Sequence, residues 1–240
     1  GASFAYNSIK GSTNAYIDGT NTGTEDSAYA KDNTDTLSVN TGRLSSSVDL
    51  AKAVDLANYA KLDLHGLKGK QLVNGIAVNA SSTQHVESIG ANVAAGANGL
   101  GLVTTINTIA GSTDAYIENA TINGVNTDGT VDQDISVIAS NHAYGNGFVG
   151  NLSIGFSGAA AGAAVDTHDI ARNTRAYING GLLAAKGDVK LNAFSTQGVS
   201  SLAVGGSGGA NAIAGTLSYA KFVNTTEAFI RHADVSASDV

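Results

Sequence analysis

The 240-residue chain contains no cysteine, proline, methionine or tryptophan, and only 14% of its residues are charged. Without cysteine it cannot form a disulfide or a thiolate metal site, and this absence is compatible with export through an oxidising periplasm. No run of lysine or arginine is long enough to follow a phosphate backbone, so nucleic acid is a poor partner. No apolar stretch reaches the roughly 20 residues that cross a bilayer, so we expect no membrane insertion.

The residues that are present favour a folded chain. Hydrophobic residues make up 42% of the sequence, glycine contributes 30 residues, and the formal net charge is -7. This composition can bury a core, so disorder is not expected for most of the chain. The chain begins at Gly1 and carries no secretion signal, from which we expect a processed chain or an internal segment of a longer protein.

One short motif occurs four times. It reads "STNAYIDG" from Ser12, "STDAYIEN" from Ser112, "NTRAYING" from Asn173 and "TTEAFIRH" from Thr225. Such recurrence predicts a structural repeat whose equivalent residues stack on one another. The predicted repeat positions are Ala15, Tyr16, Ile17, Ala115, Tyr116, Ile117, Ala176, Tyr177, Ile178, Ala228, Phe229 and Ile230. We expect Tyr177 and Ile178 to be interior stacking residues.

Two further elements accompany the motif. One is "GIAVNASST" from Gly75, "DISVIASN" from Asp134 and "DVKLNAFST" from Asp188, and the other is a segment rich in glycine and alanine such as "GAAAGAAVDTHDIARNTRAYI" from Gly158. Together they indicate a degenerate unit of roughly 50 to 60 residues, with two full units and a partial one at each end. The small residues suggest close approach of neighbouring sheets.

The period-two alternation of apolar and polar residues in these elements is typical of strands with one buried face. We therefore predict an all-β fold, a single repetitive β-solenoid over residues 1–240, in its simplest form a right-handed parallel β-helix. The spacing fixes neither the handedness nor the number of strands in each rung. A register shift among the apolar residues of "LSYAKFVNTTEAFI" predicts a bulge or a bend near Val223 and Asn224.

Residues 20–70 have no counterpart in the other units and are predicted to be an insertion. Their first half is polar and loop-like, whereas "LSSSVDLAKAVDLANYAKLDL" begins with serine caps and places Leu44, Val48, Ala51 and Val54 on one helical face. We expect a loop and one short amphipathic helix, with a strand as the alternative for "AKLDLHG".

No catalytic, cofactor-binding or metal-binding residue is predicted. The five histidines, at positions 65, 85, 142, 168 and 232, have no metal-binding spacing. Thr167, His168 and Asp169 cannot act together because strand neighbours point to opposite faces, so His168 is interpreted as an exposed residue. The acidic Asp128, Asp132 and Asp134 offer oxygen ligands but lack a calcium-loop order, and are interpreted as a solvated turn.

With these elements in place, the chain resembles the large repetitive exoproteins of Gram-negative bacteria, the filamentous haemagglutinin and leukotoxin-type filamentous adhesins. The resemblance lies in "GAAAGAAV", "NTRAYI" and "KGDVKLNA", and it covers most of the chain except residues 20–70. It implies a non-enzymatic, secreted or surface-displayed β-solenoid that serves as a stalk or in adhesion. The implied partner is a protein or glycan on a host or neighbouring cell, and the implied location is extracellular.

Two alternatives stay open. Parallel β-helices include polysaccharide lyases and hydrolases, although clustered carboxylates with sugar-stacking aromatic residues are expected in such enzymes. An uncapped solenoid also exposes strand edges at both ends, so end-to-end self-association into a surface filament is the other alternative.

Overall fold

The computed structural model describes residues 1–19, 27–28, 37–44, 68–122, 133–237 and 240. These residues form strands, turns and bends, and no helix occurs among them, which confirms the all-β prediction for this part of the chain. Nor does that part hold any helix of the length and apolarity that a membrane span requires.

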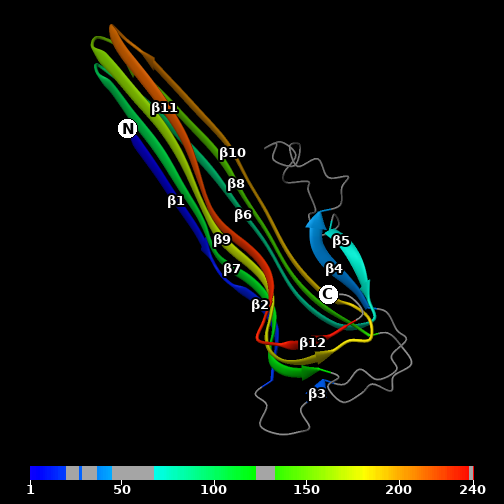
Figure 1. Cartoon of the computed structure of the whole chain (residues 1–240). Coiled ribbons are helices and arrows are strands. Elements are labelled where there is room, and N and C mark those ends of the chain that lie inside the picture. The colour runs from blue at the N-terminus through cyan, green and yellow to red at the C-terminus, as the bar shows by residue number, and fades with distance from the viewer. Residues whose placement is uncertain (20–26, 29–36, 45–67, 123–132, 238–239) are drawn as a thin grey trace.

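Two parallel sheets account for most of the structure, and they run side by side as a long arm (Figure 1). The β7–β9 sheet has the order β1-β7-β9-β11, with the short strands β2 and β3 also on β7 and β12 on β9. Its strands are β1 (Ala2–Lys10), β2 (Thr13–Asp18), β3 (Ser27–Ala28), β7 (Gly99–Ile122), β9 (Ala159–Ala184), β11 (Asn211–Arg231) and β12 (Asp234–Ser236).

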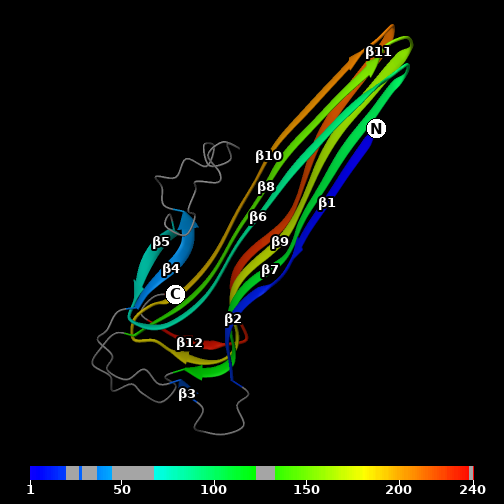
Figure 2. The same cartoon turned by 180° about the vertical axis from the view of Figure 1, so that it is seen from behind.

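The β8 sheet has the order β10-β8-β6 and consists of β6 (Gly75–Gly96), β8 (Asp134–Gly155) and β10 (Val189–Gly208). The chain crosses from this sheet to the other and back, so that β6, β8 and β10 alternate in sequence with β7, β9 and β11 (Figure 2). All these pairings are parallel. Connections between sheets therefore replace the tight hairpins that antiparallel strands would allow.

The interior between the sheets changes character along the strands. Toward the carboxyl ends of β7 and β9 it is apolar, built on a cluster that includes Ile117, Val137 and Ile178. Farther along the arm, smaller apolar clusters around Ile170 and Ala164 alternate with buried polar side chains. Every second residue of a β-strand faces the same side of the sheet, and the inward-facing residues of β9 include both apolar and polar ones.

Three strands that the structure describes begin within the predicted insertion. Strand β3 pairs with β7, whereas β4 (Leu37–Leu44) and β5 (Lys68–Val73) form an antiparallel pair, and β5 continues past residue 70. Strand β4 contacts β6 and β8 of the β8 sheet. Leu44, expected on a helix, is the last residue of β4, so that part of the helix prediction is wrong. The rest of the predicted helix and the "AKLDLHG" segment lie outside the described residues.

The bulge predicted near Val223 and Asn224 is absent from β11, whose pairing with β9 runs without a register shift from Asn211 to Arg231. The apolar pattern shifts for another reason. Leu217 and Tyr219 pair with Val165 and Thr167 on the outer face of the sheet, whereas Phe222 pairs with the inward-facing Ile170.

Candidate functional site: an outer aromatic ladder and a buried polar network

The four repeated motifs lie side by side in one band across the β7–β9 sheet. Tyr16 pairs with Tyr116, Tyr116 with Tyr177, and Tyr177 with Phe229. The successive ring centroids are 5.1, 4.8 and 5.1 Å apart, and the interplanar angles are 8°, 4° and 7°. We call these four residues the aromatic ladder. The parallel register aligns residues of the same kind, which the sequence motif alone predicted.

The motif divides between the two faces of the sheet. Ala115, Ile117, Ala176 and Ile178 are fully buried against the β8 sheet, as expected for interior positions. Their equivalents Ala15, Ile17 and Ile230 in the end strands are partly buried, and Ala228 is exposed. The aromatic residues point outward, so the expectation that Tyr177 is interior is wrong. Neighbours in a strand cannot share a face, and the apolar Ala and Ile positions occupy the inner one.

Charged and amide side chains flank the ladder on the outer face. The Arg175 Nε donates to Asp114 Oδ1 at 2.7 Å, and the Asn179 Nδ2 donates to Glu118 Oε1 at 2.8 Å. The Arg231 guanidinium lies 4.6 Å from the centroid of the Phe229 ring. The first two contacts join β7 to β9 and the third lies within β11, so side chains as well as backbone link the two central strands of the band.

The ladder surroundings also alter acidity. Burial in the stack raises the pKa of Tyr116, and neighbouring Tyr16 and Glu118 raise it further. Burial likewise raises the pKa of Tyr177, with Glu118 adding to the effect. The hydroxyls therefore stay protonated and can donate hydrogen bonds well into the alkaline range.

The stacking limits how the ladder can bind a ligand. The faces of Tyr116 and Tyr177 are covered by the neighbouring rings, so they cannot stack on a sugar. Ring edges and phenolic hydroxyls are left to contact a partner. Tyr16, at one end, is 59% exposed.

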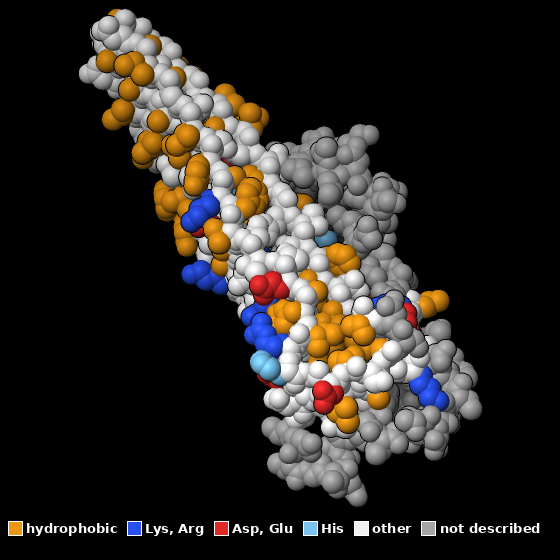
Figure 3. All heavy atoms as spheres, in the orientation of Figure 1, with side chains coloured by type: hydrophobic (Ala, Val, Ile, Leu, Met, Phe, Trp, Pro, Cys, Tyr) orange, Lys and Arg blue, Asp and Glu red, His pale blue; other side chains and the backbone are white. Residues whose placement is uncertain are grey.

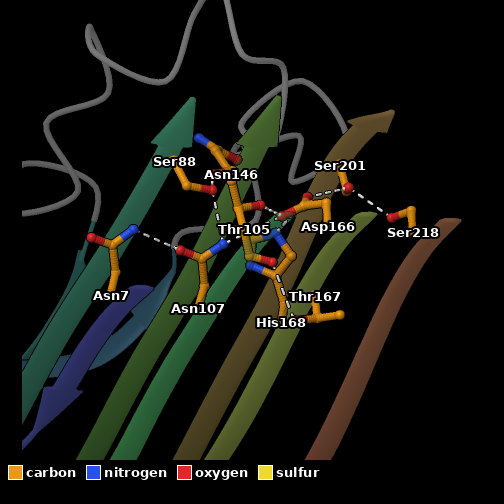
Figure 4. A network of polar contacts seen from close by, with 10 residues as sticks. All are labelled: Asn7, Ser88, Thr105, Asn107, Asn146, Asp166, Thr167, His168, Ser201 and Ser218. Atoms are coloured by element: carbon orange, nitrogen blue, oxygen red, sulfur yellow. Dashed lines mark hydrogen bonds and ion pairs between the residues drawn. The ribbon is translucent and has the colours of Figure 1, made fainter. Parts of the chain in front are cut away.

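A buried polar network crosses the arm between the two sheets (Figure 4). Asp166 of β9 is its centre and has no exposed surface. Its carboxylate accepts hydrogen bonds from the hydroxyls of Thr105 and Ser201 and lies 3.0 Å from the Nε2 of His168. Asn107 Nδ2 reaches the same carboxylate at 3.4 Å. Burial by itself raises the pKa of Asp166, but the hydrogen bonds from His168, Ser201 and Thr105 outweigh it and hold the pKa below its ordinary value.

Glycines of β8 make room for this network. A Cβ on Gly147 would overlap the Asp166 carboxylate, and a Cβ on Gly145 would overlap the His168 ring. Close approach of backbone or of neighbouring sheets was predicted for "GAAAGAA", where a Cβ on Gly162 would overlap the Asn151 side chain of β8; Gly145 and Gly147 were not predicted. The glycines of "YGNGF" in β8 therefore leave the space that the Asp and His side chains of "VDTHD" in β9 occupy between the sheets.

His168 is 1% exposed, so its interpretation as an exposed residue is wrong. Thr167 and Asp169 do face away from it, as predicted, and the partner is Asp166, two residues earlier on the same face. The signal was present in the sequence, because Asp166, His168 and the apolar Ile170 share one alternation phase. Ser201, Asp166 and His168 bring a hydroxyl, a carboxylate and an imidazole together. Because the carboxylate and the imidazole are both buried, neither can contact a substrate.

Arg172, also buried, occupies the layer between the two apolar clusters nearest to it. Its guanidinium donates to six acceptors: the backbone oxygens of Gly11, Ala110 and Ser112, Asn141 Oδ1, and the hydroxyls of Ser82 and Thr113. Burial lowers the pKa of Arg172, and Asp114 partly offsets this. Arg172 was not predicted as a buried residue, although it too lies in phase with Ile170.

The acidic residues proposed as a solvated turn are only partly described. Asp134 accepts a hydrogen bond from the backbone nitrogen of Asp188 at 2.9 Å through its Oδ1. Asp128 and Asp132 lie outside the described residues. Within the part of the chain that is described, no group of three or more acidic, histidine or cysteine residues could hold a metal ion.

The chain matches no protein-family model, no curated protein and no solved structure.

Proposed function

We propose that this chain is a non-enzymatic structural and adhesive segment of an extracellular exoprotein, built as a β-solenoid of degenerate repeats. The observation that carries the proposal is the aromatic ladder, in which equivalent residues of four motifs stack in register across one sheet. A repeated surface of this kind suits a stalk that presents the same contact several times over.

The alternating path of the chain supports the solenoid. Strands β6 to β11 pass from sheet to sheet, and each strand pairs in parallel with the one before it in its own sheet. In this reading one strand from each sheet forms a rung, and rungs add along the stack. Among the described residues of β6 to β11 all strand pairs are parallel, and such long, in-register parallel ladders are what a stack of rungs requires.

The buried polar residues favour architecture over catalysis. Asp166 and His168 are closed to solvent, and the guanidinium of Arg172 donates hydrogen bonds to six acceptors within the protein. Catalytic groups must touch a substrate, whereas these groups satisfy one another between the sheets. A carbohydrate-active enzyme is therefore the weaker reading.

The proposed binding surface is the outer face around Tyr116 and Tyr177, and its partner is a protein or glycan on a host or neighbouring cell. Phenolic hydroxyls beside the Asp114–Arg175 pair offer donors and acceptors in a repeated row. Because the ring faces are covered, binding should depend on the hydroxyls more than on sugar stacking.

The test compares the wild type with the double variant Tyr116→Phe, Tyr177→Phe on immobilised epithelial cells and on a glycan array. The rings and their stacking are retained, so the fold should be unchanged while binding falls severalfold. Tyr219→Phe, on the same face outside the ladder, is the matched control and should bind as the wild type does. Product analysis of bound glycans accompanies the array.

Two outcomes contradict the proposal. Release of new reducing ends from a glycan would establish an enzyme, and wild-type protein that binds neither cells nor glycans would remove the adhesive role.

A further inference from the structure

The part of the arm nearest its tip carries almost no charge. We call this part the distal arm, and it consists of residues 1–7, 88–107, 147–167 and 199–219. Its only charged side chain is Asp166, which is fully buried, and the amino group of Gly1 donates to a backbone oxygen of β7 at 2.6 Å. Charged side chains begin with Asp169 and Lys221, the next outward-facing positions toward the body. In Figure 3, hydrophobic side chains gather along the upper arm and charged ones appear only lower down.

The distal arm is polar inside and apolar outside. Among its inward-facing residues, Asn92 Nδ2 donates to Asn151 Oδ1 at 3.0 Å, and Asn151 Nδ2 donates to the backbone oxygen of Gly101 at 3.2 Å. The outward positions of the β7–β9 sheet carry large apolar and aromatic side chains between 45% and 74% exposed, namely Phe4, Tyr6, Leu100, Leu102, Ile213, Leu217 and Tyr219. We call this outward side the apolar face. A strand with one side in water normally has the reverse polarity.

The parallel register arranges the apolar face in rows across the four strands. One row consists of Phe4, Thr104, Val165 and Leu217, and the next toward the body consists of Tyr6, Ile106, Thr167 and Tyr219. The row after that consists of Ser8, Thr108, Asp169 and Lys221. The outer surface therefore changes from aliphatic to tyrosine-bearing to charged along the strands. Tyrosine between an apolar and a charged region is typical of surfaces that meet a lipid interface.

The apolar face lacks the cover that a parallel sheet normally has on both sides. Near the body, the outer face of the β8 sheet is covered, because Val73 of β5 packs on Ile138 and neither side chain has exposed surface. Among the described residues, nothing gives the apolar face a comparable cover, as the exposure of Phe4 and Leu217 shows. A contiguous apolar surface left open in this way marks a binding surface.

The size and chemistry of the apolar face separate the candidate partners. Four strands about 4.8 Å apart, each about 23 Å long over seven residues, give a face of roughly 450 Å². A standard protein interface buries about 800 Å² on each partner, so this face is too small for a stable complex with a second copy. It also lacks the charges that fix the register of a protein partner. Acyl chains need no register, because burial of apolar surface is not directional.

The free strand edges determine how deeply the arm can enter a bilayer. Among the described residues, β1 pairs only with β7 and β11 only with β9, so both edges of the sheet present backbone N–H and C=O groups. These groups would be unsatisfied in the hydrocarbon core. The sheet must therefore lie flat, with its side chains among the outermost acyl segments and its edges at the level of the headgroups.

We propose that the apolar face binds the surface of a lipid bilayer, with Phe4 and Leu217 among the acyl chains and Tyr6 and Tyr219 toward the headgroups. The contact stays on one leaflet, whereas the expectation of no membrane insertion concerned segments that cross the bilayer. Because no charged side chain lies on the face, binding is driven by apolar burial and does not require anionic lipid. The proposal is independent of the aromatic ladder and of any adhesive partner.

The first experiment uses vesicles of phosphatidylcholine, which carry neither protein nor glycan. The chain has no tryptophan, so Leu217→Trp provides a single fluorescent reporter on the apolar face. Val204→Trp is the matched control on the outer face of the β8 sheet, because the two native side chains are 56% and 49% exposed. With vesicles, the emission of Leu217→Trp should shift to shorter wavelength and be quenched by brominated lipid. The emission of Val204→Trp should do neither.

The second experiment measures affinity by co-sedimentation with the same vesicles. Phe4→Ser, Leu217→Ser removes two exposed apolar side chains and should lower the affinity more than about tenfold, with an unchanged circular-dichroism spectrum. Ile89→Ser, Val204→Ser makes the same change at similarly exposed positions of the β8 sheet and should bind as the wild type does. Added phosphatidylglycerol, or salt raised from about 0.05 to 0.5 M, should change the wild-type affinity less than about twofold.

Three outcomes would overturn the proposal. They are a Leu217→Trp emission that vesicles leave unchanged, a Val204→Trp emission that shifts as much as that of Leu217→Trp, and equal losses of affinity in the two double variants. A shift that appears without vesicles and grows with protein concentration would also overturn it, because a second copy would then cover the face. None of these results bears on the adhesive proposal, which is tested with the ladder variants on a glycan array free of lipid. Loss of array binding with intact vesicle binding would do the reverse.

Discussion

The two halves of the arm share one backbone design and differ in what they bury. Around Ile117 and Ile178 the inward positions are apolar and pack into one large cluster. Farther along the same strands the inward positions include Arg172, His168 and Asp166, which are equally buried. The comparison teaches that period-two alternation selects which residues face inward and does not require them to be apolar. Polar residues are tolerated where partners on three or four strands satisfy them.

The largest expected effect on folding stability comes from a substitution in the apolar half of the arm. Ile178→Asp places an unpaired carboxylate in the fully buried cluster and should destabilise the fold by more than about 4 kcal/mol. Urea unfolding followed by circular dichroism measures the loss. Ile178→Val is the control, with an expected cost of about 0.5 to 1.5 kcal/mol. A stable Ile178→Asp variant would show that this face is open to water.

The polar half of the arm should be destabilised by replacing Arg172. Arg172→Met keeps most of the side-chain volume but removes the guanidinium from six acceptors, three of them in buried hydrogen bonds, so we expect a loss of about 3 to 5 kcal/mol. The measurement is again urea unfolding. If Arg172→Met were as stable as the wild type, the guanidinium would not be what holds the layer together.

A smaller change tests the fit between the sheets. Gly147→Ala introduces a methyl group into the space of the Asp166 carboxylate and should cost about 1 to 3 kcal/mol. Gly150→Ala on the same strand meets only the Phe148 ring, at 3.6 Å, and should be neutral or slightly stabilising. Equal thermal midpoints for the two variants would argue against close packing at Gly147.

The smallest expected effect is a pH dependence. Because the pKa of Asp166 is lower in the folded chain than in the unfolded chain, its carboxylate stabilises the fold above about pH 4, and this contribution is lost as the pH falls through the folded-state value. Asp166→Asn should cost about 1 to 2 kcal/mol at pH 7 and flatten the acid limb of the stability curve. Unfolding curves between pH 2 and about 7 measure both. An acid limb unchanged by the substitution would assign the dependence to other carboxylates.

The sequence by itself was enough to predict strands, an all-β fold and the equivalence of the four motifs. Strand alternation and exact recurrence are local properties, so "AYI" in three places and "AFI" in a fourth could be aligned without coordinates. In-register pairing then follows, since parallel strands that match at Ala176 and Ile178 also match at Tyr177.

Only the tertiary structure decided which face each residue takes and what it meets there. Alternation puts Tyr177 and Ile178 on opposite faces but does not say which face is inside. The phase that Asp166 and His168 share with Ile170 mixes polar and apolar residues, so it is a signal for burial that alternation alone does not decide. Their partners, Thr105, Ser201 and the space beside Gly147, come from strands distant in sequence. Burial of such groups depends on these partners being in place together, and only the packing of the two sheets brings them there.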